Sequence, residues 1–113
     1  MSKTVVVLLC TTLLWLMPGQ ALDDPYVGYF VADLDGLHYR VAIERVNSSI
    51  YDGILQVDDE RMQLDARRYG EHMNGLLRSH SEQIRFRARV EGGILLMDTE
   101  DGRRIIFRRS TPE

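Results

Sequence analysis

Apolar and polar residues alternate along most of the chain beyond its apolar N-terminal segment. The clearest case is residues 37–46, where Leu37, Tyr39, Val41 and Ile43 occupy every second position. Successive side chains on a β-strand point to opposite faces of a sheet, so this pattern predicts a strand with one buried face. Similar segments recur between turn-forming residues. We expect eight short strands, over residues 26–34, 37–46, 51–57, 62–66, 73–77, 84–90, 94–98 and 104–108.

Two of these strand pairs have similar sequences. Residues 51–70 align with residues 73–92 after a shift of 22 positions, which places Gly53 on Gly75. Each copy contains a strand, a polar turn, a second alternating strand and a final glycine, which predicts a β-hairpin repeated once. A mid-strand glycine marks a bend or a close backbone approach. We therefore interpret Gly53 and Gly75 as sites of sheet curvature, with a backbone contact to a ligand as the alternative.

The short connections predict the order of the strands. Strands joined by tight turns pair with their sequence neighbours, so the expected fold is an all-β, antiparallel up-and-down meander. Its apolar face must be buried, which requires the sheet to curl into a small barrel or fold into a two-layer sandwich.

The N-terminal segment predicts export. Lys3 precedes an uncharged apolar run over residues 5–16, and Pro18 and Gly19 follow it. This order is typical of a secretory signal peptide, here residues 1–21 with cleavage after Ala21. A membrane-spanning helix needs about 20 apolar residues, so we expect no stable membrane anchor after cleavage. The expected mature protein, residues 22–113, is a single all-β domain in the periplasm or outside the cell.

Composition narrows the function further. Cleavage removes Cys10, Trp15 and Lys3, the only residues of their types, so no disulfide is expected. The 14 basic residues less Lys3 leave 13 arginines against 17 acidic residues, a net charge of −4. This charge argues against a nucleic-acid partner. The lack of lysine favours a bacterial source.

Catalytic and metal-binding patterns are absent from the sequence. His38, His72 and His80 have no partner at ligand spacing, and we find no paired nucleophile and base and no phosphate-binding glycine loop. The acidic clusters at residues 23–24, 58–60 and 100–101 fall in expected turns or near the start of the domain, where we interpret them as solvated. The sequence therefore predicts no enzyme, no metal and no cofactor.

Two surface features remain. Arg85, Arg87 and Arg89 alternate on one strand, opposite its core face, and form an arginine stripe. Arginine binds carboxylate and phosphate groups through two parallel hydrogen bonds, so the stripe is a candidate docking surface. The alternative is a solvated face with cross-strand partners such as Asp65.

The second feature is apolar residues on the outer face. The last two strands are apolar on both sides, so Leu96 and Ile106 are expected to point outward, as are Ile54 and Leu76 in the two hairpins. Arginine beside aliphatic side chains is typical of protein interfaces. The alternative is that the second layer of a sandwich or the N-terminal segment covers this patch.

We therefore expect a small exported, non-enzymatic binding or accessory protein that acts by contact with a protein partner or by self-association. One alternative is a lipocalin-like carrier of a small apolar ligand, because eight strands can enclose one. Against it, bulky residues are expected to fill the interior: Tyr39, Tyr51, Met62, Phe86 and Phe107. A second alternative is an inhibitor of a secreted hydrolase that uses the acidic turn at residues 58–60.

Overall fold

The computed structural model describes residues 24–111, which form a closed antiparallel barrel. Its strands are β1 (Gly28–Leu34), β2 (Leu37–Arg45), β3 (Ile50–Val57), β4 (Glu60–Tyr69), β5 (His72–Arg78), β6 (Gln83–Glu91), β7 (Ile94–Thr99) and β8 (Arg104–Ser110). The predicted signal peptide and its cleavage site lie outside the described residues. Within residues 24–111, no helix has the length and apolar character needed to cross a membrane.

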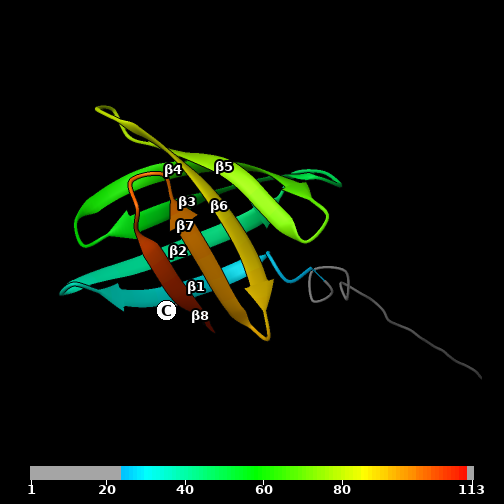
Figure 1. Cartoon of the computed structure of the whole chain (residues 1–113), viewed down its shortest axis with the longest axis horizontal. Helices are drawn as coiled ribbons and strands as arrows, with labels where there is room; N and C mark the ends of the chain where they lie inside the picture. Colours follow the sequence, from blue (N-terminus) through cyan, green and yellow to red (C-terminus); the bar gives the residue numbers. More distant parts are fainter. Residues whose placement is uncertain (1–23, 112–113) are drawn as a thin grey trace, which may run out of the picture.

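Each strand pairs with the next one along the chain, and β1 also pairs with β8. The predicted all-β meander is therefore confirmed, and the sheet buries its apolar face by closing into a barrel. In Figure 1, β6, β7 and β8 cross in front of β1, β2 and β3, so the two walls run in different directions across the shared interior.

The core fills the inside of the barrel. On β2, Tyr39, Val41 and Ile43 are at most 2% exposed, whereas His38 and Glu44 on the opposite face are exposed. The bulky residues expected to fill the interior are all buried: Tyr39, Tyr51, Met62, Phe86 and Phe107. An eight-stranded barrel is just wide enough for side chains to fill it, and large side chains occupy this one.

Several strand ends differ from the prediction. The first strand begins at Gly28, because Tyr26 lies in a turn and is buried away from the ladder. The turn between β3 and β4 is tighter than expected, because Val57 pairs with Glu60 and only two residues lie between the strands. Asp58, the first of these two residues, has a φ of 52°, a left-handed conformation that aspartate tolerates better than most residues.

The repeated segments form equivalent hairpins, β3–β4 and β5–β6. Gly53 lies opposite Leu64 in the first, and Gly75 lies opposite Phe86 in the second. A Cβ at Gly53 would lie less than 3.0 Å from the Ala42 carbonyl oxygen, and a Cβ at Gly75 would clash with Asp65 and the Phe86 ring. Both glycines therefore occupy points where neighbouring strands come too close for a side chain.

Candidate functional site

The outer side of β6, β7 and β8 carries the arginine stripe and two of the expected apolar residues. Arg85, Arg87 and Arg89 are exposed, as their alternation with the buried Phe86 and Ala88 requires. The register then continues the surface across the next strands: Leu96 pairs with Arg89 and also with Ile106. We call this surface the arginine face and define it by these five residues: Arg85, Arg87, Arg89, Leu96 and Ile106.

The other two predicted apolar residues occupy different positions. Leu76 is half-buried on β5 beside Arg85, at the edge of the arginine face. Ile54 is 39% exposed on β3, where it pairs with Ala42 and Gln63. Strand β4 lies between β3 and β5, so Ile54 and Leu76 do not form one patch despite their matching repeat positions.

The stripe arginines have few anionic partners of their own. Arg87 Nε donates to the neutral Asn74 side-chain oxygen over 3.3 Å, and Arg89 pairs with Glu91 at 3.2 Å. Within residues 24–111, neither Arg85 nor Arg87 has a carboxylate within ion-pair distance. The cross-strand partner suggested for the stripe, Asp65, instead pairs with Arg78.

The carboxylates beside the stripe already have other partners. Asp98 accepts two hydrogen bonds from Arg104, over 2.7 Å and 3.2 Å. These hydrogen bonds lower the pKa of Asp98 below its ordinary value, so the carboxylate stays charged at neutral pH. Glu100 accepts the backbone N–H of Arg85 over 2.9 Å, while its own backbone N–H donates to the Arg85 carbonyl oxygen. The Arg85 guanidinium is not engaged by either contact.

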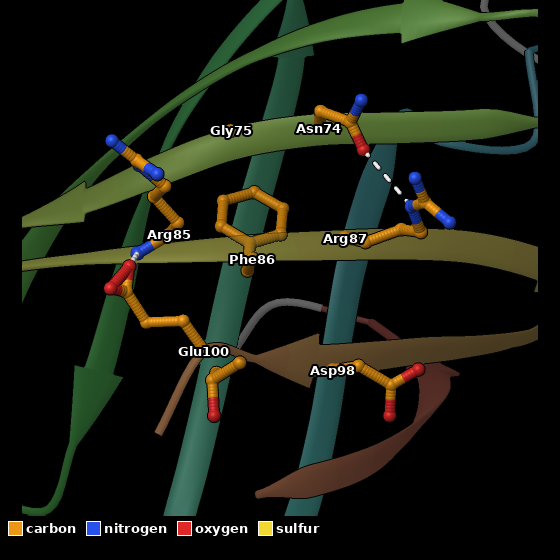
Figure 2. Close-up of a pocket in the computed structure, with 8 residues that line it drawn as sticks. Asn74, Gly75, Arg85, Phe86, Arg87, Asp98 and Glu100 are labelled. Carbon is orange, nitrogen blue, oxygen red and sulfur yellow. Dashed lines mark hydrogen bonds between the residues drawn. The ribbon is translucent and has the colours of Figure 1, made fainter. Parts of the chain in front are cut away.

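Two hollows lie along this surface. The larger, about 390 Å³, is lined by side chains that include Asn74, Arg85, Arg87 and Glu100. Figure 2 shows Arg85 and Arg87 on either side of Phe86, with Asn74 directed toward Arg87. The smaller, about 180 Å³, has these lining residues: His72, Arg87, Ala88, Arg89, Leu96, Asp98 and Arg104. Arg87 and Asp98 line both hollows, so the two adjoin.

Sequence reasoning missed Asn74, Asp98, Glu100 and Arg104 as parts of this surface. Each lies on a neighbouring strand or turn, and only the register places it beside the stripe. The hairpin repeat contained a usable signal for Asn74, because pairing Gly75 with Phe86 also pairs Asn74 with Arg87. No such signal marks the strands after the repeat.

A second polar cluster closes one end of the barrel. Asp24 is 5% exposed, so the prediction that it is a solvated residue is wrong. Its carboxylate accepts the Tyr26 backbone N–H over 3.0 Å and the Tyr51 hydroxyl over 2.8 Å. Arg45 and Arg68 lie 3.5 Å and 3.8 Å from it. These contacts therefore fix the segment that contains Asp24 across the barrel end.

The two tyrosines of this cluster are altered by their surroundings. Burial raises the pKa of Tyr26 and of Tyr51 above the ordinary value of 10.0. The Tyr26 hydroxyl donates to the Glu71 carbonyl oxygen over 2.8 Å, and the Arg68 guanidinium lies 5.0 Å from the Tyr26 ring centre. Each polar group in this cluster has a partner inside the protein, which is typical of a structural network.

The histidines lie apart from one another. His38 contacts Asp33 over 2.8 Å, His72 begins β5, and His80 lies in the turn after it. Among residues 24–111, no three His, Cys, Asp or Glu side chains are grouped as metal ligands.

Comparison with known proteins identified no relative. No protein-family model matches the chain, and no curated protein or solved structure matches it.

Proposed function

We propose that this protein is a small exported, non-enzymatic binding protein that docks a protein partner on its arginine face. The observation that supports this most strongly is the side-by-side placement of Arg89, Leu96 and Ile106 across three strands, with Ile106 58% exposed. A large aliphatic side chain that is exposed on the outer side of a strand gains nothing from contact with water.

The composition of the face supports a protein partner. Protein interfaces combine arginine with apolar side chains, because the guanidinium forms directed hydrogen bonds while its stem and the aliphatic groups bury apolar area. Arg85 and Arg87 have no carboxylate at ion-pair distance within residues 24–111, so both guanidinium groups are available to donate hydrogen bonds to the anionic groups of a partner.

The test is native mass spectrometry of the protein purified gently from its exported pool, with variants Leu96→Asp and Ile106→Asp. We expect each variant to remain folded and to lose the associated protein, because a carboxylate at the centre of the interface would be desolvated. Ile54→Asp is the matched control, since Ile54 is also an exposed aliphatic residue but lies on β3. Unchanged association of Ile106→Asp would contradict the proposal, as would equal loss in Ile54→Asp.

The same measurement separates the alternatives. A bound mass of a few hundred daltons would favour the apolar-ligand carrier, whose support is the number of strands. The packing of the interior favours docking instead, because Phe30, Tyr51 and Phe107 are fully buried there.

A complex with a secreted hydrolase would favour the inhibitor. The inhibitor hypothesis is supported by the order of the acidic turn at residues 58–60. The backbone N–H of His38 donates to the Asp58 carboxylate over 3.1 Å, and the backbone N–H of Asp58 donates to the His38 carbonyl oxygen over 3.0 Å. A turn held in this way would lose little entropy on insertion into a cleft.

A further inference from the structure

The two hollows of the arginine face form one groove along β6. They adjoin at Arg87 and Asp98, and together their linings include Arg85, Arg87 and Arg89. We propose that this groove binds an extended acidic peptide segment of the partner, with carboxylates at alternate positions facing the three arginines. This inference rests on the proposed function and specifies the chemistry of the partner.

The spacing of the arginines favours an extended ligand. Residues two apart on a strand lie about 6.6 Å apart, and an extended peptide presents its same-face side chains at that interval. Acidic residues at alternate positions of such a peptide can therefore reach Arg85, Arg87 and Arg89 together.

The available hydrogen-bond donors favour carboxylates as the bound groups. Guanidinium groups bind planar carboxylates by paired N–H donors. Arg85 makes no side-chain ion pair within residues 24–111, and Arg87 donates only to the neutral Asn74. Both can therefore form new charge-assisted hydrogen bonds without breaking an existing ion pair.

The rest of the groove favours a peptide over a uniformly charged polyanion. Asp98 lines both hollows and Glu100 lines the larger, and their negative charges would repel a densely charged polyphosphate. A peptide instead has backbone N–H groups that can donate to these carboxylates. It also has apolar side chains that can pack on Leu96 and Ile106 beside the groove.

The experiment measures binding of fluorescent peptides to the whole exported protein by anisotropy. One peptide carries three glutamates at alternate positions, and a second has the same composition with its three glutamates adjacent. Inorganic polyphosphate is the third probe. We expect the alternating peptide to bind about tenfold more tightly than the adjacent one, because only it can engage all three arginines, and to bind more weakly as salt is added.

The variants locate the binding. We expect the double variant Arg85→Gln with Arg87→Gln to lower affinity for the alternating peptide about tenfold or more. The control is Arg40→Gln with Arg61→Gln, which removes the same charge from β2 and β4 and should leave affinity unchanged. Arg85→Lys with Arg87→Lys keeps the charge but loses the paired donors, and should fall between the two. Circular dichroism checks that each variant is folded.

Three results would overturn the inference: equal binding of both peptides, no effect of the Arg85→Gln and Arg87→Gln pair, or polyphosphate binding that exceeds peptide binding and depends on that pair. The proposed function fails separately. If Ile106→Asp abolishes the native complex while neither peptide binds, docking on this face stands and the acidic-peptide inference is wrong. If Ile106→Asp leaves the native complex intact, the proposed function itself is wrong.

Discussion

At the scale of single residues, Asp24 is the charged side chain that is most deeply buried in residues 24–111. It is the one buried charged group of residues 24–111, and it lies among Tyr26, Tyr51, Arg45 and Arg68. A buried carboxylate is stable only where hydrogen bonds and opposite charges replace water. The side chains of Arg45 and Arg68 are 45% and 34% exposed, so water weakens their attraction to the Asp24 carboxylate. The hydrogen bonds from Tyr26 and Tyr51 therefore contribute more to its stability than the two arginines do.

We predict that Asp24→Ala lowers the free energy of unfolding by about 2 kcal/mol, because the Tyr51 hydroxyl and the Tyr26 N–H lose their buried acceptor. Tyr51→Phe should cost about 1 kcal/mol. Urea denaturation measures both. Since the two groups share one hydrogen bond, the double variant should lose less than the sum of the single variants. A loss below about 0.5 kcal/mol for Asp24→Ala, the size of an ordinary surface substitution, would show that this carboxylate is not buried in solution.

At the scale of elements, the two hairpins share one geometric requirement. In both, a mid-strand glycine permits an approach that a Cβ would prevent, against the Ala42 carbonyl in one and the Asp65 carbonyl in the other. At Gly75 the Phe86 ring is the second obstacle, because its two nearest atoms lie 2.8 Å from the position of an added Cβ. The repeat thus preserves the close approach of neighbouring strands as well as the alternation.

We predict that Gly53→Ala and Gly75→Ala each destabilise the barrel by about 1–3 kcal/mol, because the neighbouring strands must separate to admit a methyl group. Thermal unfolding measures the loss. Gly92→Asn is the control: its φ is 57°, nothing lies near its added Cβ, and it creates an Asn-Gly turn with Gly93. That sequence is favoured in two-residue hairpin turns, so stability should be unchanged or slightly higher. Unchanged stability of both alanine variants would contradict the packing seen here.

At the scale of the whole molecule, closure brings together the two ends of the described chain. Strands β1 and β8 meet through only three residue pairs, and Arg109 reinforces this seam. Its guanidinium donates to the Pro25 and Val27 carbonyl oxygens over 2.8 Å and 2.9 Å, and lies 4.7 Å from the Phe30 ring centre. The same contacts hold the N-terminal segment across the barrel end, so closing the barrel and covering its end are coupled.

Folding should be sensitive to alkaline pH. Burial raises the folded-state pKa of Tyr26 and Tyr51 above 10.0. Above about pH 10 the unfolded chain loses these protons while the folded chain keeps them, so stability falls with pH up to the raised folded-state pKa. Residues 24–111 contain no lysine and no cysteine, so neither of these residue types contributes to the pH dependence of stability in this range.

We therefore predict that the urea midpoint is unchanged from about pH 8 to pH 9 and falls above about pH 10. Tyr51→Phe should fall less steeply, because one of the two shifted groups is gone. Tyr29→Phe is the control for removal of a tyrosine hydroxyl from the outer face. A midpoint that stays constant to about pH 11 would contradict burial of these hydroxyls.

Local pattern alone determined the strands of this protein and their order. Alternation such as that of residues 37–45 depends only on the two-residue period of a strand, and the short turns between strands leave sequence neighbours to pair. These properties predicted eight strands in a meander, the repeated hairpin, the buried aromatic residues and the outward direction of Arg85, Arg87 and Arg89. The sequence also showed Gly53 and Gly75 as exceptions to the pattern.

Tertiary structure decided which residues far apart in the chain become neighbours. Whether the sheet closes depends on pairing between its first and last strands, which no local period encodes. A side-chain contact between distant residues buried Asp24 against Tyr51. The register of consecutive strands placed Leu96 between Arg89 and Ile106, and the strand order left Ile54 on another part of the wall. Alternation assigns a side chain to one face of the sheet, but only register and closure determine the surface that it joins.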